Sequence, residues 1–264
     1  MKVPYINLAA QHIPIMSELL AEVESVLKTG QFILGKTVAD FEKKFAEICG
    51  ANYAIGVANG TDALVLALKV AGIKAGDEVI TAPNSFLASA SSIALAGAIP
   101  VFADVRDDFN IDPEQIKKLI GPKTKAIMPV HLTGRPADMD AIMDIANAHN
   151  LIVIEDAAQA VSASYGNKKV GSIGHLACFS LHPLKNLSAA GDGGVITTND
   201  DELATRCQLI RNHAEAVVDD MGVTDLTNMW GFNFRMPEME AAIGLEQIKK
   251  IDLLTEQRFQ NVNY

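Results

Sequence analysis

Residues 151–194 read LIVIEDAAQAVSASYGNKKVGSIGHLACFSLHPLKNLSAAGDGG. The segment begins with the apolar run LIVIED, which predicts a buried strand ending at Asp156. The run ACFSL at 177–181 predicts another strand, and Lys185 follows it in a glycine-rich turn. Lys185 is flanked by leucines, which is a poor setting for a solvated surface charge. The stretch therefore predicts a carboxylate and an amine that both follow strands of one sheet.

Outward from this stretch, strand-like and helix-like segments alternate along the chain. Further apolar runs predict strands at 53–58, 78–82, 100–105, 125–130 and 193–198. Apolar residues at helical spacing predict helices at 16–27, 37–49, 61–72, 85–97, 138–150, 200–212 and 237–254. This rhythm predicts an α/β fold of three layers, in which helices cover both faces of a mainly parallel sheet.

The composition excludes several classes of protein. The 264 residues are 49% hydrophobic and 20% charged, with a net charge of −10, which is unfavourable for general nucleic-acid binding. The three cysteines form no CxxC pair, so reduced thiols are expected. We find neither a signal core at the N-terminus nor an apolar run of transmembrane length. These observations favour a cytoplasmic protein without membrane or nucleic-acid partners.

Residues 30–37, GQFILGKT, match the P-loop pattern and raise the alternative of a nucleoside triphosphatase. A P-loop follows a strand, whereas the segment before Gly30 is predicted to be helical. Its interior Phe-Ile-Leu is also bulky for a phosphate cradle. Thr37 and Asp40 instead resemble a capping box that opens the next helix. A P-loop enzyme is therefore the distant alternative, and a dinucleotide-binding fold lacks its glycine signature.

Asp156 and Lys185 are the pair that pyridoxal phosphate (PLP) chemistry requires. A lysine amine condenses with the PLP aldehyde, and a carboxylate keeps the pyridine nitrogen protonated so that the ring accepts electrons. Asp156 could otherwise be a carboxylate that caps the turn after its strand. Glu155 alternates to the other face of the strand and is expected to be structural.

The segments around these two residues, with PYINLAAQ at 4–11 and NFRMPEMEAAIGLEQIKKI at 233–251, resemble the DegT/DnrJ/EryC1/StrS family of sugar aminotransferases. That family belongs to the fold-type-I PLP enzymes, and the resemblance covers nearly the whole chain. It implies a PLP-binding large domain at 1–250 that includes an N-terminal helical segment. Residues 251–264 would begin the connection to a small C-terminal domain, most of which is absent.

Gly60, Thr61 and Asp62 follow Asn59 in a turn between a predicted strand and helix. Backbone N–H groups at a helix start bind anions, although an ordinary N-cap turn needs the same residues. The resemblance places the PLP phosphate at this turn and on Ser180.

The resemblance also assigns three residues to the cofactor. Phe86 would stack on the pyridine ring, where a core phenylalanine is the alternative. Gln159 would contact the ring, and Asn233 would reach the phosphate of a neighbouring subunit in a homodimer with shared active sites. Asn233 could equally be a turn-former before a helix.

His182 and Arg235 are candidates for the substrate side of the site. A branch of the family that dehydrates sugars has histidine where Lys185 stands, so lysine here favours transamination. Three positions depart from the family pattern, and they are Phe234, Asp192 and Ala214.

The resemblance implies a transaminase that moves an amino group from an amino acid, glutamate being expected, to a nucleotide-linked keto-sugar. Pyridoxamine phosphate would carry the amino group, and Lys185 would move the protons. Amino-sugar biosynthesis for a cell-surface polysaccharide is the expected setting. The alternatives are a non-nucleotide cyclic ketone as substrate, the dehydratase branch, and a PLP-binding regulator. A regulator is disfavoured because no DNA-binding helix-turn-helix is apparent and the chain is acidic.

Overall fold

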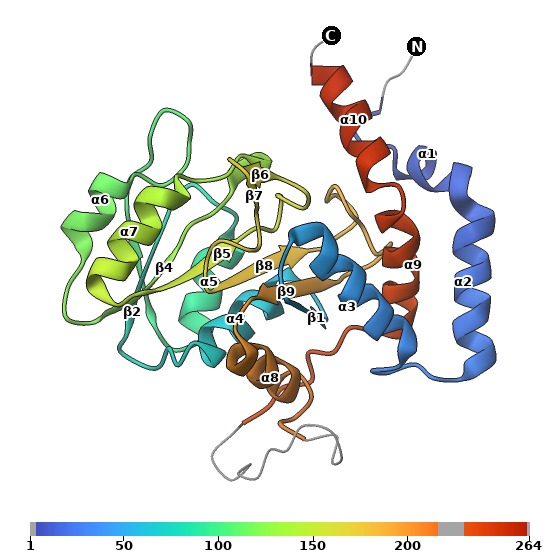
Figure 1. Ribbon diagram of the computed structural model, residues 1–264, viewed down its shortest axis with the longest axis horizontal. Coiled ribbons are helices and arrows are strands. Elements are labelled where there is room, and N and C mark those ends of the chain that lie inside the picture. The colour runs from blue at the N-terminus through green and yellow to red at the C-terminus, as the bar shows by residue number, and fades with distance from the viewer. Residues whose placement is uncertain (1–3, 216–229, 263–264) are drawn as a thin grey trace.

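The computed structural model of the protein describes residues 4–215 and 230–262, and a seven-stranded sheet lies at its centre (Figure 1). Its strand order is β1-β9-β8-β5-β4-β2-β3. The strands are β1 Tyr53–Val57, β2 Glu78–Thr81, β3 Ile99–Phe102, β4 Thr124–Met128, β5 Ile152–Asp156, β8 Leu176–Ser180 and β9 Gly194–Thr198. The pairs of β9 with β1 and β8 are antiparallel, and the other described pairs of this sheet are parallel. The predicted, mainly parallel sheet is therefore confirmed.

The helices follow the predicted alternation closely. The longer helices are α2 Met16–Thr29, α3 Lys36–Cys49, α4 Gly60–Val70, α5 Leu87–Leu95, α7 Met139–His149, α8 Asp201–Ile210, α9 Glu238–Ile248 and α10 Ile251–Val262. The shorter elements are α1 Leu8–His12, η1 Ile13–Ile15, α6 Pro113–Leu119, η2 Leu132–Gly134 and the hairpin strands β6 Ser164–Tyr165 and β7 Lys168–Lys169. The sequence patterns did not predict this hairpin or the shorter helices.

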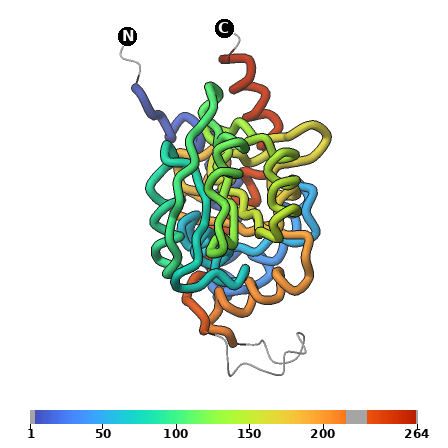
Figure 2. Tube along the Cα trace, turned by 90° about the vertical axis from the view of Figure 1, so that its left-hand side faces the viewer, coloured from blue at the N-terminus to red at the C-terminus, as the bar shows by residue number. Residues whose placement is uncertain are grey.

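Strand residues alternate between two cores because successive side chains point to opposite faces of the sheet. In β8, Cys178 packs in the core beneath α4 and α8, whereas Phe179 packs in the core beneath α3 and α9. A third core joins β2 and β4 to α6 and α7. The sheet is therefore covered on both faces, and the tube view shows the helices wrapped around it (Figure 2).

The segment that matches the P-loop pattern lies between two helices, α2 and α3. Gly30 ends α2 with a φ of 68°, in the left-handed region that glycine adopts easily. No described strand enters this segment apart from a single bridge between Ile33 and Pro237. Lys36 is exposed and pairs with Asp40 one helical turn later. The context that a phosphate-binding loop needs is missing from this part of the described chain.

The predicted capping box at Thr37 and Asp40 is wrong. The N-cap of α3 is Gly35, and no side chain of α3 itself caps the helix. Glu238, the first residue of α9, accepts hydrogen bonds from the backbone N–H groups of Gly35, Thr37 and Val38. The negative carboxylate also complements the positive end of the α3 dipole. A distant residue therefore performs the local role that the sequence pattern suggested.

The single helix predicted at 237–254 is also wrong, because Lys249 and Lys250 separate α9 from α10. Beyond this break, α10 extends away from the sheet (Figure 1). In α2, Leu19 and Val26 are buried, whereas Leu20 and Leu27 of the predicted apolar face are more than half exposed. None of the described helices is both long enough and apolar enough to cross a membrane.

The capping contact predicts a measurable effect on stability. Glu238→Ala should lower the free energy of unfolding by about 1–3 kcal/mol, because it leaves three N–H groups without their buried acceptor. Thr37→Ala is the matched control and should change stability by less than about 0.5 kcal/mol, since its side chain caps nothing. Chemical denaturation of both variants measures the difference, and equal losses would contradict the assignment of the cap to Glu238.

Candidate active site

A pocket of about 730 Å³ opens where the parallel strands end. Its walls are formed by residues that follow β1, β2, β4, β5 and β8 at their carboxyl ends, with additions from the glycine-rich turn and α10. Ligands of open α/β sheets bind at this edge, because loops from several strands converge there. The pocket brings together most of the residues that the sequence singled out, namely Gly60, Thr61, Phe86, Asp156, Gln159, Ser180, His182 and Lys185.

The turn between β1 and α4 forms one end of the pocket. Asn59 caps α4 by accepting a hydrogen bond from the Asp62 N–H at 2.9 Å. A Cβ added to Gly60 would lie 2.7 Å from the Cβ of Ser180, so only glycine lets the helix start approach β8 this closely. Backbone N–H groups at the start of α4 therefore lie next to the Ser180 hydroxyl. This end of the pocket suits a phosphate group.

Asp156 lies in the floor of the pocket and is only 5% exposed. Its Oδ2 accepts a hydrogen bond from the Ser89 hydroxyl at 2.6 Å, and its Oδ1 accepts one from the Ala158 N–H at 3.2 Å. Burial raises the pKa of this carboxyl, while the Ser89 and Ala158 hydrogen bonds and the nearby charge of Lys185 oppose the rise. An ionised carboxylate here would be stabilised by a cationic N–H partner, such as a protonated pyridine.

Lys185 projects from the turn after β8 and is partly buried. Burial lowers the pKa of its amine, and the charge of Asp156 opposes this effect. The turn is held by the Lys185 N–H, which donates to the His182 carbonyl at 2.8 Å. The Asn186 amide also donates to the Val161 carbonyl at 2.8 Å. The turn thus fixes an amine whose neutral form is favoured by burial, which is what attack on an aldehyde requires.

Phe86 and Gln159 both lie on the pocket wall. Phe86 lies in the loop that follows β2, and Gln159 in the loop that follows β5. Phe86 is the N-cap of α5 and is 80% exposed, so its ring is available to stack on a planar ligand. The alternative of a core phenylalanine is therefore wrong. Gln159 accepts a hydrogen bond at Oε1 from the Thr133 N–H at 2.8 Å. Its amide N–H groups donate to no other residue of the described chain and can face a ligand.

Three predicted residues lie outside the lining of this pocket. The Asp62 carboxylate accepts a hydrogen bond from the Asn59 amide at 2.9 Å and serves the cap of α4. Asn233 is exposed and forms an isolated bridge with Asn212, whose Oδ1 accepts a hydrogen bond from Arg235 at 2.9 Å. Neither Asn233 nor Arg235 reaches the pocket of its own chain.

Sequence reasoning missed several polar residues of the site, including Ser89, His131 and Arg258. Ser89 reaches Asp156 from α5, His131 lies in the wall after β4, and Arg258 reaches the rim from α10. His131 is fully buried; its Nδ1 accepts from the Ala137 N–H at 3.1 Å, so its Nε2 donates to Glu155 at 2.9 Å. The only sequence signal for any of them is the position of Ser89 on the same predicted helix as Phe86, which could have placed Ser89 near the pocket.

Glu155 is structural, as its position in the strand predicts. It is fully buried, and its carboxylate accepts backbone N–H bonds from Gly171 at 3.2 Å, Ile173 at 3.1 Å and Gly174 at 2.7 Å. With His131 as a fourth donor, this carboxylate has no capacity left for a ligand.

The residues present fit PLP. The anion-binding turn, the exposed ring of Phe86, the buried Asp156 carboxylate and the Lys185 amine meet the requirements of its phosphate, ring, pyridine nitrogen and aldehyde. The tight contact at Gly60 supports the phosphate end, because any larger residue would displace the α4 N-terminus from Ser180.

Comparisons with known proteins agree with this geometry. Residues 14–264 match the DegT/DnrJ/EryC1/StrS aminotransferase family. The chain is 46% identical over 259 residues to the pleiotropic regulatory protein of Geobacillus stearothermophilus, covering 98% of this chain and 68% of that protein. It is 46% identical over 224 residues to the GDP-perosamine synthase of Caulobacter vibrioides, covering 83% of this chain and 58% of that protein.

Among solved structures, the fold is similar to that of DesV from S. venezuelae in complex with a ketimine intermediate. The TM-score is 0.89 and the sequence identity 39%, and the match covers 95% of this chain and 66% of that chain. The chain thus spans between 58% and 68% of the length of these three proteins.

The burial of Asp156 predicts a pH-dependent effect on stability. Because its pKa is raised in the folded protein, ionised Asp156 destabilises the cofactor-free fold at neutral pH. Asp156→Asn should therefore raise the free energy of unfolding at pH 7, because the amide carries no charge to bury. The gain should vanish below the ordinary pKa of aspartate, where both states are protonated. Urea denaturation between pH 3.5 and 8 measures this, and a gain independent of pH would contradict it.

Proposed function

The chain belongs to the DegT/DnrJ/EryC1/StrS aminotransferase family with a fold-type-I architecture, and we propose that it transfers an amino group from an amino acid to a nucleotide-linked keto-sugar. Its cofactor is PLP, which supplies an aldehyde for an amine and a ring that accepts electrons, with pyridoxamine phosphate as the amino-carrying form. The observation that carries the proposal is the placement of Lys185 and Asp156 in one pocket with an anion-binding turn.

In this proposal Gly60, Thr61 and Ser180 hold the phosphate, and Phe86 stacks on the ring. Asp156 accepts the pyridinium N–H and retains its negative charge, because the cationic partner offsets the cost of burial. Gln159 and Asp62 were also predicted to bind the cofactor. Gln159 has free N–H groups at the wall, whereas Asp62 supports the turn from behind by holding Asn59.

Lys185 moves protons between carbon atoms at the reacting centre. Its lowered pKa increases the neutral fraction that can accept a proton. His182 lies at the same wall and accepts the Leu184 N–H at Nδ1, at 3.2 Å. Its Nε2 is therefore free to donate to an oxygen of the substrate.

Arg258 is the cation that the substrate side of the pocket needs. It reaches the rim from α10, and Lys185 is the other lysine or arginine among the lining residues. A nucleotide-linked sugar carries a diphosphate, which an arginine binds well through two parallel hydrogen bonds. Arg235, which the sequence suggested for an anion, instead donates to Asn212 outside the pocket of its own chain.

A set of keto-sugars tests the reaction. With PLP and glutamate, the protein should aminate at least one nucleotide-linked keto-sugar, and it should leave non-nucleotide cyclic ketones unchanged. Lys185→Ala should abolish the amino product, because no other amine replaces it at the aldehyde. Borohydride should attach the cofactor to the peptide that contains Lys185. Mass spectrometry of the product and of the labelled peptide measures both.

Lys36→Ala is the matched control for this test, since Lys36 is exposed in a segment between helices. It should leave cofactor binding and turnover unchanged. Attachment of the cofactor to another lysine would contradict the assignment of Lys185. Amination of only a cyclic ketone would favour that alternative substrate, and loss of water from the sugar would favour the dehydratase branch. Cofactor binding without turnover of any substrate would favour a regulator, the role in the name of the Geobacillus relative.

We also propose that the active unit is a homodimer. Phe86, which lines the pocket, and its neighbour Leu87 are 80% and 74% exposed, which is a poor surface for a free monomer. Asn233 lies outside the pocket of its own chain, so its predicted contact with a phosphate requires a second subunit.

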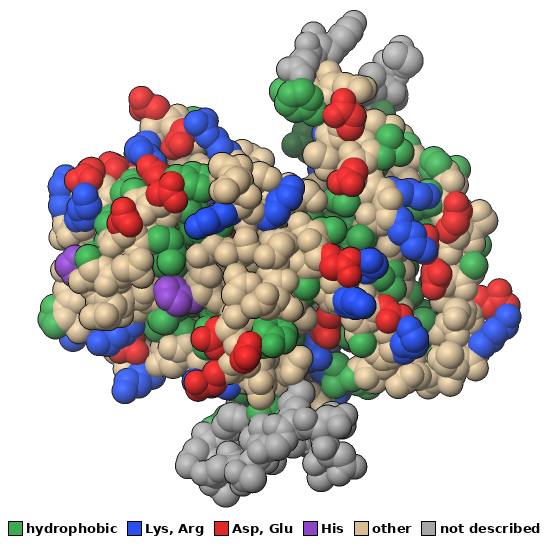
Figure 3. Space-filling model, in the orientation of Figure 1, with side chains coloured by type: hydrophobic (Ala, Val, Ile, Leu, Met, Phe, Trp, Pro, Cys, Tyr) green, Lys and Arg blue, Asp and Glu red, His purple; other side chains and the backbone are tan. Residues whose placement is uncertain are grey.

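Positive and negative side chains are interspersed on the face that Figure 3 shows, which argues against binding of a nucleic acid to that face.

Mixing two variants, each of which lacks one residue of the site, tests the sharing of sites. If Asn233 acts across the interface, a heterodimer of Lys185→Ala and Asn233→Ala subunits contains one site in which both residues are intact. The mixture should therefore bind PLP covalently with near-normal affinity at some of its sites. If Asn233 acts within its own chain, each site of the heterodimer lacks one residue and mixing restores nothing. Sedimentation velocity confirms that mixed dimers have formed.

The chain's location and domain division are also proposals. Cys49, Cys178 and Cys207 are free and buried, which agrees with a reducing compartment, and we propose a cytoplasmic location. We assign residues 1–250 to the PLP-binding domain and residues 251–264 to the beginning of its connection to a small domain. The interruption of the helix between α9 and α10 lies at this proposed boundary.

A further inference from the structure

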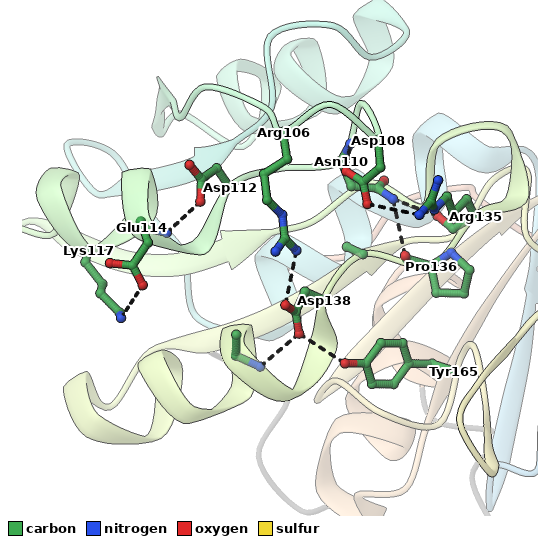
Figure 4. Close-up of polar contacts among 12 residues, drawn as sticks. Arg106, Asp108, Asn110, Asp112, Glu114, Lys117, Arg135, Pro136, Asp138 and Tyr165 are labelled. Atoms are coloured by element: carbon green, nitrogen blue, oxygen red, sulfur yellow. Dashed lines mark hydrogen bonds and ion pairs between the residues drawn. The ribbon is translucent and has the colours of Figure 1, made fainter.

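Asn110 is buried behind the pocket wall, in the segment that follows β3, with 1% of its surface exposed. Its amide nitrogen donates to the carbonyls of Arg135 at 3.3 Å and Pro136 at 3.2 Å (Figure 4). Its amide oxygen accepts the Leu132 N–H at 3.4 Å. One neutral side chain therefore supplies both donors and an acceptor to a single loop, the segment 132–136.

The segment that carries Asn110 is itself fixed. The Asn110 carbonyl accepts from the Arg106 N–H at 2.9 Å, and the Asn110 N–H donates to Asp108 at 3.1 Å. The Asn84 amide donates to the Phe109 carbonyl at 2.9 Å. Asn110 can therefore hold the loop from a rigid base.

The loop 132–136 places one N–H group at the pocket. Thr133 has a left-handed backbone, with φ 54° and ψ 19°, and its N–H donates to Gln159 Oε1 at 2.8 Å. A backbone N–H can only donate, so the carbonyl of the Gln159 amide must face it and the NH₂ group must face away. A Cβ on Gly134 would lie 3.0 Å from the backbone carbonyl oxygen of Gln159, which shows how closely the two segments approach.

We propose that Asn110 is a positioning residue for the cofactor site. By holding the loop 132–136, it keeps the Thr133 N–H on Gln159 and directs the Gln159 NH₂ group into the pocket, toward an acceptor on the cofactor ring. Asn110 does not itself line the pocket. This inference rests on the proposed function, because it assumes that PLP occupies the site.

The strength of PLP binding and the pH response of its absorbance separate positioning from mere stabilisation. Without Asn110 the loop can shift and Gln159 can rotate, so its donor is lost for part of the time. Losing one hydrogen bond should weaken PLP binding about 2- to 10-fold. A donor to the hydroxyl oxygen on the cofactor ring stabilises the deprotonated form of the cofactor. Loss of this donor in the Asn110 variants should therefore raise the pH midpoint of the visible absorbance change.

The experiment measures both quantities in the PLP-bound protein for Asn110→Ala and the milder Asn110→Ser, which keeps one hydroxyl. The same substitutions are made in a Gln159→Met background, which has no amide left to orient. There, replacing Asn110 should change PLP binding less than about 2-fold, because coupled residues are not additive. Tyr165→Phe is the control, since it removes a hydrogen bond to Asp138 in the neighbouring cluster without touching the loop 132–136 (Figure 4).

Folded Asn110 variants with wild-type affinity and midpoint would overturn the inference, as would an equal loss of affinity in the Gln159→Met background. An equal effect of Tyr165→Phe would likewise show a general loss of structure. If Asn110→Ala does not fold, Asn110→Ser gives the same decision. Failure of the wild-type protein to bind PLP would instead contradict the proposed function, before any Asn110 variant is compared.

Discussion

The buried charge of Asp156 is the constraint on which the site depends. A carboxylate that is 5% exposed needs compensation, and the described part of the chain supplies two hydrogen bonds, from Ser89 and Ala158. Lys185 contributes an opposing charge, but burial also lowers its pKa, so the two groups do not fully neutralise each other. A cationic ring nitrogen would complete the set. The uncompensated charge of Asp156 in the cofactor-free site therefore favours binding of a ligand with a cationic ring nitrogen.

Glu155 and Asp156 show how one strand separates two tasks. They are adjacent, so the pleat of β5 sends their side chains to opposite faces of the sheet. Glu155 is satisfied by three backbone N–H groups and His131, and it fastens the loops behind the sheet. Asp156 receives fewer donors and faces the pocket. Glu155 is structural because its carboxylate has a full set of hydrogen-bond donors. Asp156 has fewer donors, so its carboxylate can still bind a ligand.

The sequence predicted those parts of the protein that depend on short-range patterns. Alternating apolar runs indicated the sheet, and the strand ends placed Asp156, Ser180 and the Asn59 turn at the same edge. It could not predict the cap of α3 because Glu238 lies 203 positions from Gly35. A local pattern at Thr37 suggested a cap where the tertiary contact already supplied one.

The break between α9 and α10 could not be predicted from the local sequence either. Its apolar positions continue through the predicted helix, and the lysines at 249 and 250 are strong helix formers, so nothing local indicates a stop. The hydrophobic periodicity also marked Leu20 and Leu27 as core, although these side chains are largely exposed. Periodicity reports that a face is apolar, but it does not report what covers that face.

Asn110 and Arg258 show why polar residues of a site are harder to find than its acid and amine. Asn110 acts 25 and 26 positions away, on the carbonyls of Arg135 and Pro136, and a single asparagine after a strand has many ordinary roles. Arg258 lies on a helix whose pattern indicates only an apolar face. Both become meaningful once β3, β4 and α10 are placed around the pocket. The reactive groups can therefore be predicted from local sequence, whereas the groups that orient them depend on how the layers pack.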